Sequence, residues 1–129
     1  MSTFQRQIEC TIPILPVSHL PKAIAFYTRT LGFKLEWGGQ VGSVIASVSR
    51  DGCARMLAET GPGAPRTWVW IGLEDDSIFH EFRKAGVKDR QEPRNFSWAY
   101  EMKFEDPDGN VIWLGTEPRK DLPLEDANV

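Results

Sequence analysis

The sequence predicts an α+β protein built from one βαβββ unit that occurs twice. Asp-Gly turn signals at 51–52 and 108–109, and helix-ending glycines Gly32 and Gly86, recur at nearly constant spacing. A repeat of about 56 residues is one supersecondary unit that cannot bury its sheet face alone. We therefore expect one domain in which two modules form a concave sheet, with the helices on its outside.

The first module is expected over residues 9–60 and begins with a strand in CTIPILPV, residues 10–17. Its prolines place this strand near a sheet edge or a bulge. A helix follows, with Ser18 suited to cap its start and Gly32 to end it. One face of this helix carries apolar residues at helical spacing: Leu20, Ile24, Tyr27 and Leu31.

Three short strands complete the first module, around 33–37, 42–50 and 53–58. The last two are joined by Asp51-Gly52, a strong hairpin signal. The Gly- and Pro-rich residues 61–66 then read as a linker between the modules.

The second module, residues 67–116, repeats the pattern. A strand in RTWVWIGL is followed by a helix in EDDSIFHEFRKAG, capped by Asp75 or Asp76. Inward-facing positions of this helix are Ile78, Phe79 and Phe82. Strands are expected near 87–92, 98–105 and 110–115. Residues 117–129 form a polar tail, either disordered or clasping a partner.

Composition narrows the class of protein. The 129 residues are 41% hydrophobic with a net charge of −3, and no basic stripe or long apolar run is present. We expect neither nucleic acid nor a membrane as a partner. Cys10 and Cys53 have no metal-type spacing, so a reducing cytoplasm is the expected location.

The duplicated pattern, with PVSHLPKAIAFYTRTLGF in module one and DPDGN in the last hairpin, resembles the vicinal oxygen chelate superfamily. That group includes glyoxalase I, extradiol dioxygenases and bleomycin-resistance proteins. The segments TWVWIGLEDD and SWAYEMKFEDPDGN look most like the bleomycin-resistance branch. The resemblance implies paired modules that form a cup, usually completed in a homodimer.

The resemblance also implies where a metal would be held in the enzymes of the superfamily. By motif spacing the ligand positions fall on Ile12, Met56, Trp68 and Trp113. Divalent metals of this class need imidazole or carboxylate donors, which none of the four supplies. We therefore expect no metal and no cofactor. The register of the last strand of module one leaves open that Glu59 lies nearer the site.

Strand alternation indicates which side chains face the groove. Val69 and Ile71 share the parity of the core, which leaves Trp68 and Trp70 on the opposite face. Exposed indoles on a sheet are costly unless a ligand or a subunit covers them. Ligand lining and a core or subunit contact are both compatible with this pattern.

The strand at 98–105 adds polar candidates. Glu101 and Lys103 alternate with the core residues Met102 and Phe104, so they face either the groove or simply solvent. By resemblance, Trp98 occupies an aromatic position that binds planar rings in bleomycin-resistance proteins. Its neighbours are Ser and Ala where that branch has proline and glycine, which argues against bleomycin itself.

These features favour a metal-free protein that binds and sequesters an aromatic or drug-like small molecule, without catalytic residues. The expected ligand contacts are Ile12, Ile14, Met56, Trp68, Trp70, Trp98, Glu101, Lys103 and Trp113. Two alternatives remain open. One is a metal-dependent lyase, isomerase or dioxygenase whose ligands lie elsewhere. The other is an interaction module whose aromatic face is a subunit interface.

Overall fold

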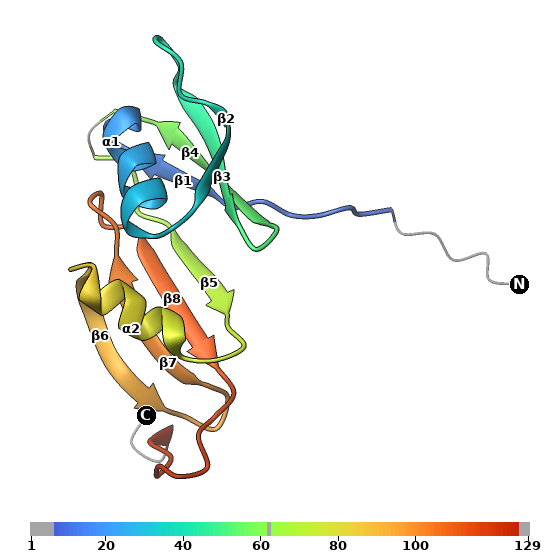
Figure 1. Cartoon of the computed structure of the whole chain (residues 1–129), viewed down its shortest axis with the longest axis vertical. Coiled ribbons are helices and arrows are strands. Elements are labelled where there is room, and N and C mark those ends of the chain that lie inside the picture. The colour runs from blue at the N-terminus through green and yellow to red at the C-terminus, as the bar shows by residue number, and fades with distance from the viewer. Residues whose placement is uncertain (1–6, 62, 127–129) are drawn as a thin grey trace, which may run out of the picture.

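The chain folds as the same βαβββ unit twice, with the two units in contact (Figure 1). The computed structural model describes residues 7–61 and 63–126. Within those residues no helix is long and apolar enough to cross a membrane.

Module one opens with a strand, a helix and a π-helical turn, followed by three strands. Their bounds are β1 Ile14–Val17, α1 Leu20–Ala25, η1 Phe26–Thr30, β2 Lys34–Gly38, β3 Ile45–Arg50 and β4 Cys53–Glu59. Asp51 and Gly52 both adopt positive φ, 51° and 76°, as the predicted two-residue hairpin requires.

Module two repeats this order without the π-helical turn. Its elements are β5 Trp68–Gly72, α2 Ser77–Lys84, β6 Lys88–Asn95, β7 Tyr100–Glu105 and β8 Val111–Thr116. Gly86, at φ 80°, follows the end of α2 as predicted.

Each module makes its own four-stranded sheet, with strand order β1-β4-β3-β2 in one and β5-β8-β7-β6 in the other. The first strand of each sheet runs parallel to the last strand of its module, and the other pairs are antiparallel. Ile14 lies opposite Met56 in the first sheet, as Trp70 lies opposite Trp113 in the second. The register thus confirms the repeat and the predicted fold class.

Two expectations for the start of module one are wrong. The cap of α1 is His19 and not Ser18: the His19 Nδ1 atom accepts from the Lys22 backbone N–H at 3.2 Å. The first strand begins at Ile14 and not at Cys10: its register with β4 starts at Ile14 opposite Met56, whose backbone N–H donates to the Pro13 carbonyl oxygen at 2.9 Å. Residues 7–11 precede it as an exposed segment that extends away from the body (Figure 1).

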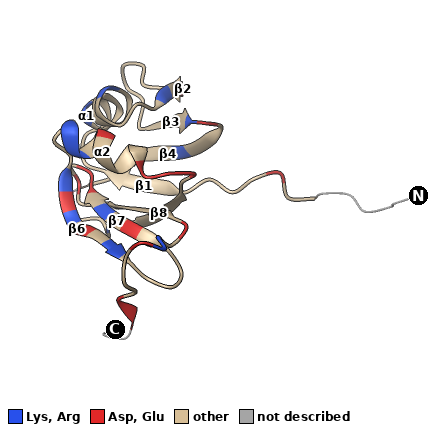
Figure 2. Ribbon diagram, turned by 60° about the horizontal axis from the view of Figure 1, so that its bottom comes forward, with Lys and Arg blue, Asp and Glu red and all other residues tan. Residues whose placement is uncertain are grey.

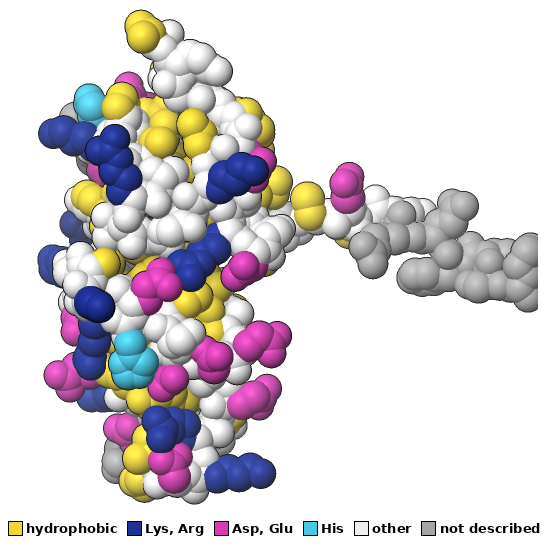
Figure 3. Space-filling model, in the orientation of Figure 1, with side chains coloured by type: hydrophobic (Ala, Val, Ile, Leu, Met, Phe, Trp, Pro, Cys, Tyr) yellow, Lys and Arg dark blue, Asp and Glu magenta, His cyan; other side chains and the backbone are white. Residues whose placement is uncertain are grey.

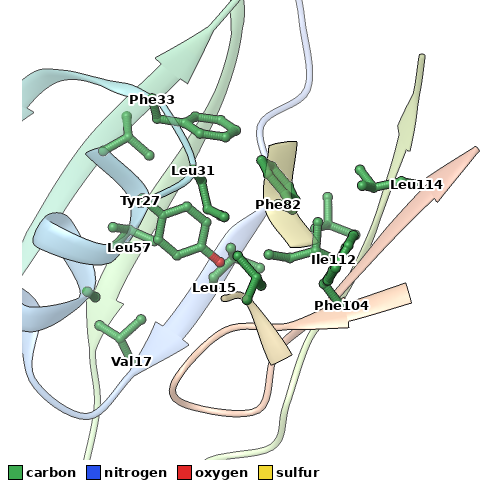
Figure 4. Close-up of a cluster of buried hydrophobic side chains, with 14 of the residues drawn as sticks. Leu15, Val17, Tyr27, Leu31, Phe33, Leu57, Phe82, Phe104, Ile112 and Leu114 are labelled. Atoms are coloured by element: carbon green, nitrogen blue, oxygen red, sulfur yellow. The ribbon is translucent and has the colours of Figure 1, made fainter. Parts of the chain in front are cut away.

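One hydrophobic core joins the two modules. Figure 4 shows Tyr27, Leu31 and Phe33 of module one packed toward Phe82 and Ile112 of module two. These side chains lie on the helix side of both sheets. The opposite face of each sheet is therefore left uncovered within one chain.

Polar contacts also connect the modules, and two of them involve side chains of both. The buried Tyr27 hydroxyl donates to Asp106 Oδ2 at 2.8 Å. Asp106 in turn accepts from the backbone of its own turn, at Asp108 and Asn110, as the sequence suggested for an Asp at this corner. On the surface, Arg50 of β3 pairs with both carboxylate oxygens of Glu81 on α2.

The described part of the polar tail folds back on module two. Asn95, at the end of β6, is 1% exposed and bonds the backbone of Arg119 through both its amide oxygen and its amide nitrogen. The tail carries on to Asp126, whose carboxylate accepts from the Ser97 backbone N–H. Residues up to 126 thus brace the loop that carries Trp98.

Charges of both signs are interspersed over the molecule. β6 and β7 carry acidic and basic residues along their length (Figure 2). On the face that the helices occupy, charged side chains of both signs alternate with hydrophobic ones (Figure 3). This mixture fits the absence of a basic stripe in the sequence.

Candidate functional site

The open face of the module-two sheet carries Trp68, Trp70 and Trp113, which together are called the indole wall below. Trp68 and Trp70 on β5 share the face of Trp113 on β8, because the alternation of each strand sends Val69, Ile112 and Leu114 to the core. The Trp113 ring meets both other indoles edge to face, at centroid distances of 6.1 and 5.2 Å. Offset edge-to-face packing is a favoured aromatic geometry.

Glu101 lies at the centre of this face although it is 2% exposed. Its carboxylate accepts from two indole N–H groups, from Trp113 at 2.7 Å and from Trp98 at 2.9 Å. Gln91 on β6 donates a weaker bond of 3.3 Å to the same carboxylate. Glu101 therefore fixes the planes of two tryptophans that come from different segments.

Lys103 places an ammonium group beside these indoles. Its ammonium lies 3.6 Å from the Glu101 carboxylate, donates to Gln91 Oε1 at 2.8 Å, and stands 4.7 Å from the centre of the Trp113 ring. It is 5.7 Å from the Trp68 ring, as is the guanidinium of Arg90. Cations at this distance interact favourably with the ring faces.

Gly115 makes room for one of the indoles. A Cβ atom at this position would overlap the six-membered ring of Trp70. The ring of Trp70 can therefore lie flat over β8 only because residue 115 has no side chain.

The fourth tryptophan stands at the edge of the wall. Trp98 lies in the loop between β6 and β7 and stacks on Phe96 with a centroid distance of 4.6 Å and an interplanar angle of 4°. Phe96 is buried, so it holds the outer ring in place. Trp68, Trp70 and Trp98 remain 52%, 48% and 55% exposed, which leaves their outer ring surfaces free for contact.

Some of the predicted site residues lie together in the structure, and the others lie outside that cluster. Trp68, Trp70, Trp98, Glu101, Lys103 and Trp113 form one connected cluster. Ile14 and Met56 belong to the other sheet, where the strand register pairs them with each other. Ile12 is half-buried and precedes β1, so it lies outside the strand on which it was expected.

The metal-ligand positions of the resemblance do not fit a divalent metal ion. Ile12, Trp68 and Trp113 supply no imidazole or carboxylate donor, and Met56 offers only a soft thioether sulfur. Glu59, the remaining candidate, accepts from the Leu20 backbone N–H at 2.8 Å and so serves the start of α1. Within residues 7–61 and 63–126, no group of three or more His, Cys, Asp or Glu side chains is placed to hold a metal.

Sequence reasoning missed four contributors to this site: Gln91, Arg90, Phe96 and Gly115. The β6 sequence, KDRQEPRN, has no apolar alternation that would place its side chains, and its register with β7 contains two irregularities. The signal for Gly115 was available, since a glycine inside a strand indicates the close approach of another group.

The fold and the site together define a duplicated βαβββ protein with one aromatic sheet face left open. The chain belongs to the Glyoxalase/Bleomycin resistance protein/Dioxygenase superfamily, whose family model matches residues 7–114. Comparison with curated proteins gives no match.

Solved structures with the same fold include two proteins from Streptomyces sp. CB03234. TnmS3, an antibiotic binding protein from Streptomyces sp. CB03234, is 29% identical over 89% of this chain and 100% of its own, with a TM-score of 0.71. A glyoxalase/bleomycin resistance protein from the same organism is 30% identical over 81% of this chain and 96% of its own, with a TM-score of 0.67.

The bleomycin-binding protein from Streptomyces verticillus, solved with copper(II)-bleomycin, has a TM-score of 0.74. It is 22% identical over 89% of this chain and 100% of its own, and this likeness shows the fold.

Proposed function

We propose that this protein binds and sequesters an aromatic, drug-like small molecule without a metal and without chemical conversion. The observation that carries the proposal is the wall of partly exposed indoles, held in place by the buried carboxylate of Glu101. A surface of this kind is costly in water, so a ligand that covers it gains the free energy of burial.

The fixed ring planes favour a flat ligand. The edge-to-face contacts and one hydrogen bond to Glu101 restrain Trp113, and a second hydrogen bond to Glu101 restrains Trp98. Little side-chain entropy is therefore lost when a ligand binds. Stacking on each indole contributes about 0.5–1.5 kcal/mol beyond area burial. TnmS3, a solved structure with the same fold, is an antibiotic binding protein, which supports this ligand class.

The polar centre of the wall favours a ligand with hydrogen-bonding groups on its rim. Lys103 is only partly exposed, with 17% of its side chain accessible, and lies between Trp113 and Gln91. An acceptor group on the ligand, such as a carbonyl or phenolate oxygen, would satisfy its remaining N–H donors.

We further propose that the working form is a homodimer. Module one presents an open apolar face of its own, which includes Ile14 at 54% exposed and Trp37 at 47%. One chain keeps this face and the indole wall on separate sheets. A second copy would bring the Ile12, Ile14 and Met56 surface of one chain against the indoles of the other, and the exposed segment 7–11 would add contact area.

The free, exposed thiols of Cys10 and Cys53 fit a reducing compartment, and we place the protein in the cytoplasm.

Titration with planar aromatic compounds, bleomycin among them, while tryptophan emission is followed, tests the proposal. We expect saturable quenching or a spectral shift that Trp68→Ala and Trp98→Ala weaken at least tenfold. His80→Ala, on the exposed side of α2, is the matched control and should bind as the unaltered protein does.

Three results would contradict the proposal. The first is a set of flat aromatic compounds that leaves the emission unchanged in all variants. The second is stoichiometric zinc, nickel, iron or manganese in protein purified without chelators, which would favour the metal enzyme. The third is a dimer in which the indoles are completely buried with no cavity left, which would favour the interaction module.

A further inference from the structure

Arg55 on β4 is a buried cation that no carboxylate of residues 7–61 or 63–126 pairs with. The residue is 3% exposed, and its Nε and Nη1 atoms have no hydrogen-bond partner among those residues. Its position on the strand shares the parity of Leu57, so it points to the helix side of the sheet, away from the indole wall. Burying an unpaired charge costs several kcal/mol, so a group that compensates it is expected nearby.

The neighbours in the chain do not supply that compensation. The Arg55 guanidinium lies 4.6 Å from the centre of the Phe33 ring. This cation–π contact is attractive, but it does not neutralise the charge. Burial lowers the pKa of Arg55, while the nearby Tyr27 and Cys53 oppose that shift. An arginine nevertheless stays protonated in proteins.

A cavity whose lining includes Arg55 lies at the junction of the modules. Its volume is about 90 Å³. Arg55 and Phe33 form its module-one wall, and Ile71, Phe82 and Leu114 form its module-two wall. Figure 4 shows Phe33 and Phe82 facing each other across this junction.

Two other charged residues line the cavity, but neither adds a buried and uncompensated charge to that of Arg55. Arg50 already donates to Glu81 at 2.7 and 3.0 Å and to the Leu31 carbonyl oxygen, so its charge is largely compensated. Asp51 is exposed at the turn between β3 and β4 and lines the cavity together with Cys53. The other lining residues are glycine or apolar, so Arg55 is the buried charge of this lining.

We propose that this cavity is a binding site for a small monocarboxylate, of the size of acetate or propionate, held by Arg55. A guanidinium donates its N–H groups in the plane that a carboxylate accepts in, and charge-assisted bonds of this kind are the strong ones. The volume equals that of about three liquid waters, which matches a carboxylate with one or two carbons attached. The apolar walls receive those carbons.

The site lies on the opposite side of the sheets from the indole wall and does not depend on the function proposed above. Because its walls come from both modules, an anion bound there connects them. Binding to the folded chain alone then stabilises the fold by mass action, in proportion to the logarithm of ligand concentration.

Equilibrium dialysis of the purified protein against radiolabelled acetate, at pH 7 and constant ionic strength, is the primary test. We expect one saturable site per chain and a melting temperature that rises with sodium acetate but not with equal sodium chloride. Propionate should compete with acetate, whereas the bulkier benzoate should not.

Arg55→Met should lose acetate binding at least tenfold, and Arg55→Lys should weaken it by less. Arg83→Gln, on α2 and away from the cavity, is the matched control and should bind as the unaltered protein does. If Arg55→Met does not fold, dialysis of the unaltered protein and of Arg55→Lys still decides the question.

Several outcomes overturn the proposal: no saturable acetate binding, an equal melting shift with chloride, or unchanged binding in Arg55→Met. A crystal grown in acetate with only waters beside the Arg55 guanidinium does so as well. Trp68→Ala should leave acetate binding intact, so failure of the aromatic site and failure of this one are distinguishable.

Discussion

Replacing Glu101 by glutamine tests whether one carboxylate organises the indole wall. The carboxylate accepts from the indoles of Trp113 and Trp98 on separate oxygens, at 2.7 and 2.9 Å. Glutamine offers a single acceptor oxygen and places an NH₂ donor where the other indole N–H points. One charge-assisted bond thus becomes a neutral one, and one donor is left facing another.

The cost follows from these two changes. Weakening a bond to a charged acceptor loses about 1 kcal/mol, and an unsatisfied donor costs about 1–3 kcal/mol. The Trp98 indole is 55% exposed and can turn to water, which keeps the second cost near the lower end of its range. Loss of the anion beside Lys103 adds to the total, so we expect Glu101→Gln to lower the free energy of unfolding by about 3 kcal/mol.

Urea unfolding followed by far-ultraviolet circular dichroism measures this change. With a denaturant slope of roughly 1–3 kcal/mol per M, the midpoint should fall by roughly 1–3 M. Tryptophan emission of the folded variant should move toward longer wavelength, because the freed indoles become hydrated.

Glu92→Gln, on the same strand pair but exposed, is the control and should change stability by no more than about 0.5 kcal/mol. If Glu101→Gln also changes stability by no more than about 0.5 kcal/mol and leaves the tryptophan emission unaltered, the carboxylate does not hold the indoles in place.

Three further changes have defined outcomes. Tyr27→Phe removes the hydroxyl bond to Asp106 and should cost about 1–2 kcal/mol in urea unfolding; no measurable cost would mean that this bond does not connect the modules. The hydrogen bond from Arg50 lowers the pKa of Glu81 below its ordinary value of 4.5, so the stability it contributes is present above that pH and is lost as pH falls through the folded-state pKa. Glu81→Gln should therefore flatten the acid side of a melting-temperature profile, and an unchanged profile would contradict this. Gly115→Ala should displace the neighbouring indole, weaken aromatic ligands several-fold and leave the circular dichroism spectrum unchanged; undiminished binding would show that this ring does not contact the ligand.

The sequence specified the local elements well because their signals are short-range. The Asp-Gly pair at 51–52 needs two positive φ angles, which only a few residues adopt easily, and the structure has them at 51° and 76°. The alternation that places Val69 in the core and Trp68 on the open face is likewise a property of one strand. The constant spacing of these signals predicted the duplication and, through it, the fold class.

The N-cap of α1 depends on a long-range contact that the local sequence does not indicate. Serine is a common cap, and Ser18 stood at the expected place. In the structure the Ser18 backbone N–H bonds the Asp108 carboxylate of module two at 2.9 Å, and His19 caps the helix. A contact across 90 positions of sequence decided which residue took the role.

The sequence by itself therefore determined the two modules, their elements and the aromatic face of β5, all of which depend on neighbouring residues. Only the tertiary structure decided that Glu101 would be buried between Trp98 and Trp113, and that Arg55 would lie unpaired beside a cavity. The strand pattern left open whether Glu101 faces the groove or solvent, and it contains no signal for the burial of Arg55. Whether such a side chain meets water, an indole or an empty space depends on which distant strand lies beside it, and the periodicity of a single strand carries no information about that.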